Sequence, residues 1–279
     1  MALKTPVVDR IPTYPGRVKL TPVSGQTNTY DLVRADQPIA EGTPINKALF
    51  DQKAYTLTGD VTLYVATTGS DVTGDGTSAA PYATIQKAVD SLPKWLDGYT
   101  ATIDIANGTY EEALRVSGFQ GGILAIGYAF RSVTVRSVTV NASSTVRLEL
   151  SIARTAGTGG TPLSVRNGSS VMIGDNMVID GGGLGSGIEV ETGSLLYTGE
   201  DLMDDLRTTI NNCPYNAVYV TGGSRIQLSI VQGSNNKTGF RANGGTIIYS
   251  SSTLTATTLH VTTNGGRIYA GAQTSVTKY

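Results

Sequence analysis

The sequence predicts an all-β fold, a right-handed parallel β-helix that carries an N-terminal capping helix and a short extended N-terminal adaptor arm. Three observations favour this fold. Strand-like segments recur at intervals of 21 to 29 residues, each recurrence contains a glycine-bearing turn, and charged residues make up only 15% of the chain. Soluble domains average about a quarter charged residues. That deficit, together with 34 glycines, favours turn-dense β structure over long helices.

The recurrence is clearest in five segments, PLSVRNGSSVMI, GIEVETGSLLY, AVYVTGGSRIQL, GFRANGGTIIY and TLHVTTNGGRIY. Each holds an apolar–x–apolar strand, a turn and a second β segment. Their turn glycines are spaced by 25, 29, 22 and 21 residues and are Gly168, Gly193, Gly222, Gly244 and Gly265. Such a period without intervening helices is typical of a β-solenoid, whereas a sandwich needs hairpin turns at closer spacing.

Alternation along the first strand of each segment predicts which side chains face the core. The expected inward pairs are Leu163/Val165, Ile188/Val190, Val218/Val220, Phe240/Ala242 and Leu259/Val261. The residues between them face outward, and coils of a β-helix stack about 4.8 Å apart. We therefore expect one stripe, a surface for glycan or for a partner protein, made of Ser164, Glu189, Tyr219, Arg241 and His260.

Residues 1–55 are predicted to be a separate extended arm. Six of the ten prolines lie here. Because proline fixes φ and has no N–H, the arm is neither a central strand nor a long helix. Short strands are expected at Arg17–Val23 and Tyr30–Arg34. A helix should follow, with Thr43 as N-cap, Pro44 at its first position and Ile45, Ala48 and Leu49 on its apolar face. We expect so small an apolar surface to become ordered against a partner.

The β-helix is expected over residues 56–279, with a cap at 56–97. A strand is predicted at Val61–Val65, and apolar residues at helical spacing predict a helix that ends at Pro93: Ile85, Ala88, Val89 and Leu92. Between them, Asp71 and Asp75 lie in a glycine-rich loop. That loop lacks the further oxygen ligands of a calcium site, so turns built by aspartate hydrogen bonds are the preferred interpretation.

Composition limits the function classes. The net charge is −1 and lysine and arginine do not cluster, so no nucleic-acid role is expected. Cys213 is the only cysteine, and one cysteine with one histidine excludes a Cys/His metal site. No cofactor and no metal are predicted. Neither a signal peptide nor a membrane-inserting segment is recognisable, so we expect synthesis in a reducing cytoplasm and Cys213 as a small buried residue.

Two segments resemble known families. Residues 63–93, LYVATTGSDVTGDGTSAAPYATIQKAVDSLP, resemble the start of pectin-lyase-like β-helices, where a strand, an Asp/Gly loop and a helix cap the N-terminal end. Residues 10–52 resemble the N-terminal segment of tail-fibre and baseplate-associated proteins from phages and prophages of Gram-positive bacteria.

The second resemblance implies a virion protein of the tail or baseplate, in which the N-terminal segment attaches to other tail or baseplate proteins. The attachment residues implied are Arg17, Val18, Leu20, Tyr30, Leu32, Arg34, Pro44, Ile45, Leu49 and Phe50. Similar phage β-helices are usually homotrimers, so self-association is expected. The function implied is a structural tail fibre or spike that contributes to host-surface recognition.

An enzyme remains the alternative, as a polysaccharide-degrading tailspike. Glu189 and Glu191 project from one face of a strand, about 6–7 Å apart, between the separations of retaining and inverting carboxylate pairs. A lyase would need a basic residue such as Arg241 or His260. Tyrosines recur in the coils at Tyr197, Tyr219, Tyr249 and Tyr269, where they could stack on sugars or line a trimer interface.

Overall fold

The computed structural model describes residues 11–12, 18–25, 27–28, 30–34, 38–40, 56–127, 132–153, 160–199 and 206–271. The chain divides into two compact units, Met1–Ala54 and Tyr55–Tyr279. Each unit is described by itself.

The first unit contains two antiparallel strand pairs. β1 (Ile11–Pro12) pairs with β4 (Pro38–Ala40), and β2 (Val18–Pro22) pairs with β3 (Tyr30–Arg34). Both predicted strands are confirmed, and β2 ends at Pro22, one residue earlier than expected. The predicted helix from Thr43 to Leu49 lies outside the described residues.

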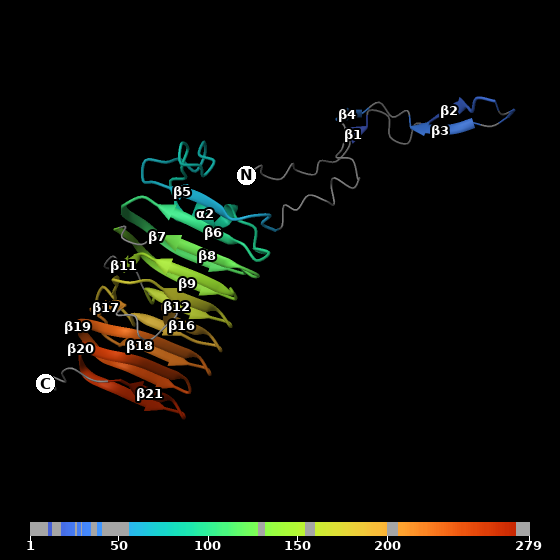
Figure 1. Cartoon of the computed structure of the whole chain (residues 1–279). Coiled ribbons are helices and arrows are strands. Elements are labelled where there is room, and N and C mark those ends of the chain that lie inside the picture. Colours follow the sequence, from blue (N-terminus) through green and yellow to red (C-terminus); the bar gives the residue numbers. More distant parts are fainter. Residues whose placement is uncertain are drawn as a thin grey trace. The chain divides into compact units, whose positions relative to one another are not determined.

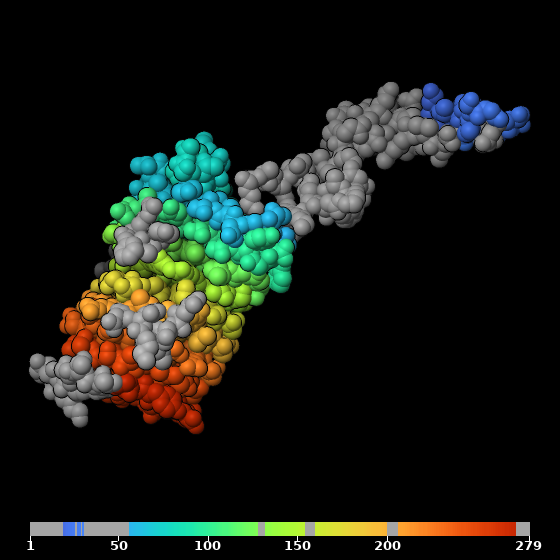
Figure 2. Space-filling view, in the orientation of Figure 1, coloured from blue at the N-terminus to red at the C-terminus, as the bar shows by residue number. Residues whose placement is uncertain are grey.

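The second unit is a parallel β-helix, as predicted. Seventeen strands form one continuous sheet, and every pairing in it is parallel. Figure 1 shows the strands stacked one above another from β5 to β21, and in Figure 2 the colours follow the sequence in consecutive bands along the stack. Segments far apart in the sequence are therefore neighbours one coil above or below.

Three faces make up the coil. The first is formed by β5 (Val61–Val65), β6 (Thr100–Ile105), β8 (Ile123–Gly127), β10 (Thr145–Glu149), β13 (Ser170–Ile173), β16 (Leu195–Thr198) and β21 (Arg267–Ala270). The second is formed by β11 (Ser151–Ala153), β14 (Met177–Asp180) and β17 (Arg207–Asn211), and the third by β12 (Leu163–Arg166), β15 (Ile188–Val190) and β18 (Asn216–Thr221). Longer strands turn from face to face: β7 (Gly108–Ser117), β9 (Val133–Asn141), β19 (Arg225–Asn243) and β20 (Thr246–Thr263).

Stacked aliphatic side chains fill the interior. On the third face, four of the five predicted inward pairs are completely buried: Leu163/Val165, Ile188/Val190, Val218/Val220 and Phe240/Ala242. Cys213 is buried as well, which confirms its prediction. Burial and the nearby Asp180 carboxylate raise the pKa of its thiol to about 12, so the group is an inert thiol at neutral pH.

The predicted turn glycines all adopt positive φ, between 62° and 76°. A left-handed conformation suits glycine because it has no Cβ. A buried serine follows each of four such turns: Ser143, Ser169, Ser194 and Ser224. Ser143 lies two residues after Asn141, and the other three each lie one residue after a glycine, Gly168, Gly193 or Gly223.

These four serines form a ladder along the stack, named here the serine ladder. The Oγ of Ser143 accepts from the N–H of Phe119, and the Oγ of Ser169 accepts from the N–H of Ser143, both at 3.2 Å. The Ser194 Oγ accepts from Ser169 at 3.2 Å, and the Ser224 Oγ accepts from Ser194 at 3.1 Å. Each hydroxyl thus satisfies a backbone donor of the preceding coil at a corner where the strand ladder is interrupted.

The N-terminal cap holds the described helix, α2 (Ile85–Ser91), which confirms the predicted apolar face of Ile85, Ala88 and Val89. Thr84 is its N-cap, with its side chain accepting from Lys87 N. The Glu112 carboxylate from β7 accepts from the N–H groups of Ile85 and Gln86, each at 2.9 Å. The first turn of a helix leaves such donors unpaired, so a strand side chain fastens α2 to the stack.

The cap loop is held by aspartates, as predicted. Asp75 Oδ1 accepts from Thr77 N at 2.9 Å, and Asp71 accepts from Ala83 N and from the backbone and hydroxyl of Thr84. Burial acts to raise the pKa of Asp71, but the hydrogen bonds from Thr84 and Ala83 outweigh it and hold that pKa below its ordinary value.

Candidate functional site

The outer surface of the third face carries the predicted stripe. Strand register aligns Ser164 with Glu189, Glu189 with Tyr219, and Tyr219 with Arg241. The same register extends toward the N-terminus, where Thr139 of β9 pairs with Ser164 and Arg115 of β7 pairs with Thr139. We use the name stripe for this set: Arg115, Thr139, Ser164, Glu189, Tyr219 and Arg241.

His260 is exposed, as predicted, but the strand register does not place it in the stripe. Arg241 pairs with Val261, and His260 pairs with the inward residue Phe240. The cause is the length of the turn that follows this strand. Ala242 pairs with Thr262, and Thr246 pairs with Arg267. The step from Ala242 to Thr246 is four residues, whereas the matching step from Thr262 to Arg267 in the next coil is five. Of the predicted inward pair, Leu259 is partly buried and packs against the core, whereas Val261 is in register with the outward residue Arg241.

His260 instead lies exposed at the end of the stack, beside two aromatic residues of the core. Its Nε2 lies 2.6 Å from the Tyr249 Oη, and its ring centroid lies 5.7 Å from that of Phe240. The Phe240 and Tyr249 rings stack with centroids 4.4 Å apart. Burial lowers the pKa of His260. Tyr249, predicted as a surface tyrosine, is only 1% exposed, so the pair serves packing rather than ligand binding.

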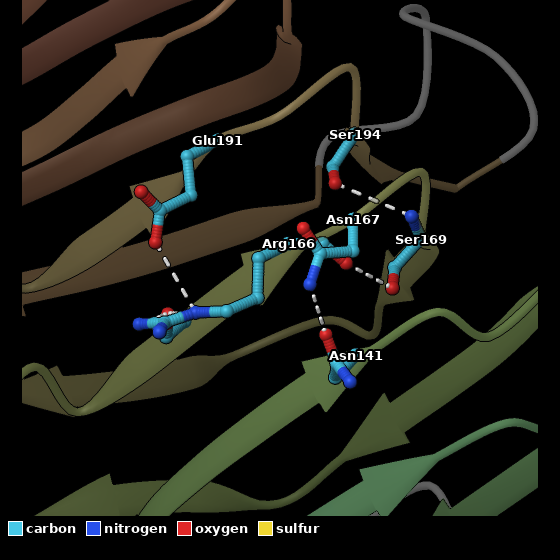
Figure 3. A network of polar contacts seen from close by, with 7 residues as sticks. Asn141, Arg166, Asn167, Ser169, Glu191 and Ser194 are labelled. Atoms are coloured by element: carbon cyan, nitrogen blue, oxygen red, sulfur yellow. Dashed lines mark hydrogen bonds and ion pairs between the residues drawn. The ribbon is translucent and has the colours of Figure 1, made fainter.

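Arg166 organises the centre of the third face. Its Nε and Nη2 donate to the Ser164 Oγ at 2.9 and 2.6 Å, and its Nε lies 3.1 Å from the Glu191 Oε1 (Figure 3). Ser164 points outward as predicted, but it is buried beneath this guanidinium. The Asn167 amide donates to Asn141 of the preceding coil at 2.6 Å.

The ion pair bears on the catalytic alternative. Glu189 lies in β15, and Glu191 directly follows that strand and is engaged by Arg166. A glycosidase needs two carboxyl groups that both face the scissile bond. With one of them committed to a neighbouring side chain, the pair is better suited to shaping the surface than to hydrolysis.

Tyr219 and Arg241 form a second feature of the stripe. The Arg241 guanidinium carbon lies 5.8 Å from the centroid of the Tyr219 ring, within the range of a cation–π contact. Asn243 Nδ2 donates to the Tyr219 Oη at 3.2 Å, which fixes the ring. Within the described parts of the chain, the buried Nε of Arg241 has no hydrogen-bond partner. An oriented aromatic ring beside an arginine can stack on a sugar ring and bind its hydroxyls.

At the other end of the stripe lies a groove of about 770 Å³ over β7, β9 and β12. Three arginines line it, Arg115, Arg136 and Arg166, together with the hydroxyl side chains Ser117, Ser137, Thr139, Thr161 and Ser164. Of these, only Ser164 was predicted as a site residue. Extending the alignment to the buried residues Leu114 and Val116, two coils before the five compared segments, would have placed Arg115 in the stripe.

Arg136 was harder to foresee. In β9 the buried residues on either side of the corner are Val135 and Val138, so Arg136 and Ser137 are two consecutive outward residues there. A strict two-residue period assigns one of them to the core. Corners break that period, and the sequence alone does not locate them.

In the first unit, the predicted attachment residues fall into two groups. Val18, Leu20, Tyr30, Leu32 and Arg34 lie in the β2–β3 hairpin, where Leu20 and Tyr30 are 60% and 54% exposed. Arg17, Pro44, Ile45, Leu49 and Phe50 lie outside the described residues. A short hairpin with exposed apolar side chains suits contact with another protein.

Among the described residues, no three His, Cys, Asp or Glu side chains are placed to hold a metal ion, and no helix is long and apolar enough to span a membrane. Comparison with protein families, with curated proteins and with solved structures gives no match for this chain. The function is therefore argued from the geometry of the third face and of the β2–β3 hairpin.

Proposed function

We propose that this chain is an appendage of a phage tail or baseplate, a tail fibre or spike, that contacts the host surface. Its N-terminal unit attaches to other virion proteins, and its β-helix presents the stripe to a cell-surface glycan. The observation that carries the proposal is the ordered pair of Tyr219 and Arg241 on an outward face. A passive spacer has no need of an oriented aromatic ring beside an unpaired buried donor.

The attachment role is supported by the division of the chain at Ala54 and by the exposed apolar residues of the β2–β3 hairpin. Removal of residues 1–54 should leave a soluble β-helix that no longer enters virions. Particle composition after complementation with the truncated chain measures this. Normal incorporation of the truncated chain contradicts the attachment role.

The recognition role is tested on host cells or on a glycan array. Tyr219→Ala and Arg241→Ala should each weaken binding, because they remove the stacking surface and the guanidinium donors. Tyr215→Ala, which removes an exposed tyrosine outside the stripe, is the matched control and should bind normally. Unchanged binding in both stripe variants would place the contact elsewhere.

Self-association is part of the proposal, as a homotrimer. On the first face an outward row with several apolar members lies in register, Met172, Tyr197, Gln227, Ile248 and Tyr269. Aromatic and methionine side chains are enriched where subunits meet. Light scattering on the purified chain should give about three times the 29.1 kDa of one chain. A mass of one chain contradicts the trimer.

A further inference from the structure

The groove over β7, β9 and β12 has a distinct electrostatic character. Its lining contains Arg115, Arg136 and Arg166 and no aspartate or glutamate. Arg166 is paired with Glu191. Among the described residues, no carboxylate pairs with Arg115 or Arg136. In a chain of net charge −1, this leaves two uncompensated positive charges facing one concave surface.

The arginines stand at different levels and sides of the groove. Arg115 lies one coil before Thr139 and two coils before Ser164, about 9.6 Å along the stack at 4.8 Å per coil. Arg166 covers Ser164, and Arg136 stands at the corner of β9. A ligand that meets all three must therefore extend across more than one coil.

The remaining lining residues define the rest of the ligand. Hydroxyls of Ser137, Thr139 and Thr161 face the groove, and no aromatic side chain lines it. Nucleic-acid sites usually add aromatic platforms for the bases. A volume of about 770 Å³ is within the range of sites for small molecules and oligosaccharides and is too small for a folded partner.

We infer that this groove binds an anionic saccharide, one whose carboxylate or phosphate groups are held by Arg115 and Arg136. Guanidinium groups recognise both kinds of anion through paired, charge-assisted hydrogen bonds, and the hydroxyl side chains bind the sugar hydroxyls. The inference rests on the proposed function in one respect, that the β-helix contacts glycan. It adds a second subsite, separate from Tyr219 and Arg241, and selects a charged ligand.

The test is calorimetric titration of the full chain with four probes: an oligoglucuronate, a short poly(glycerol phosphate), a neutral dextran oligosaccharide and a single-stranded DNA of matched charge. At least one anionic saccharide should bind in a salt-dependent manner, and dextran should not bind to the groove. The two anionic probes distinguish carboxylate from phosphate as the group recognised. Tighter binding of DNA than of either saccharide would overturn the inference in favour of a nucleic-acid site.

Variants locate the binding. Arg115→Gln and Arg136→Gln should each weaken it about tenfold or more, since each removes charge-assisted hydrogen bonds. Arg225→Gln, an exposed residue of the first face, makes the same change in net charge and should have no effect. Thr139→Asp places a carboxylate between Arg115 and Ser164 and should abolish binding without any loss of arginine.

The outcomes separate this inference from the broader proposal. Absence of binding to both anionic probes, or equal loss in Arg225→Gln, refutes the groove assignment. If Tyr219→Ala still abolishes attachment to cells in that case, the proposed function stands without the groove. Loss of saccharide binding in Arg115→Gln, with Tyr219→Ala unaffected, supports the groove as an independent subsite.

Discussion

Truncation of one hydroxyl in the serine ladder should destabilise the β-helix measurably. In Ser194→Ala, the N–H of Ser169 loses its acceptor at 3.2 Å in a position where Ser169 is 1% exposed. Leaving a buried donor unpaired costs about 1–3 kcal/mol. For a unit the size of Tyr55–Tyr279, about 2 kcal/mol corresponds to a fall in Tm of roughly 4–8 °C.

Thermal unfolding of the full chain, followed by circular dichroism, measures the change. Ser170→Ala is the matched control. Ser170 directly follows Ser169, faces outward in β13 and is half-buried. Surface substitutions of this kind stay within about 0.5 kcal/mol. Hydrogen exchange should also become faster at the Ser169 amide. Equal melting temperatures of Ser194→Ala and Ser170→Ala would refute the argument that the ladder satisfies backbone donors.

Two further predictions concern the ends of the stack. Because burial lowers the pKa of His260 below 6.5, the unfolded chain binds that proton more tightly. The contribution of His260 to stability is therefore complete above about pH 6.5 and is lost as the pH drops through the folded pKa. His260→Gln should flatten the dependence of the melting temperature on pH between pH 7.5 and 5. An unchanged slope of melting temperature against pH contradicts this. At the other end, Glu112→Ala should cost about 1 kcal/mol by unpairing the first turn of α2, with Glu112→Gln intermediate in a chemical denaturation series.

Periodicity in the sequence was enough to predict the fold. Strand alternation identifies the core wherever the coil is straight, as in Leu163, Ile188 and Val218. The helix of the cap follows from apolar spacing in the same way. The capping carboxylate of Glu112 does not, because it comes from a strand 27 residues further along the chain, and only the winding of the coil brings it to the helix.

The site was predictable only in part. Tyr219 and Arg241 follow from aligning strands by their apolar residues. His260 falls outside the stripe because turns of unequal length shift that alignment by one residue. Arg166 was assigned no role, since its contact with Ser164 runs back along its own strand and its contact with Glu191 crosses to the next coil.

The register of the stripe makes the distance between its two proposed subsites a discrete quantity. Arg115 and Tyr219 are four coil steps apart, about 19 Å at 4.8 Å per step. Duplication or loss of one whole coil between them would change this distance by one increment and would leave the chemistry at either end untouched. A repeating saccharide whose bound groups fit the distance set by one number of coils would not fit the distance set when one coil is added. Under the proposed function, a lineage of such proteins would alter its host range by gaining or losing whole coils, with no substitution at any contact residue.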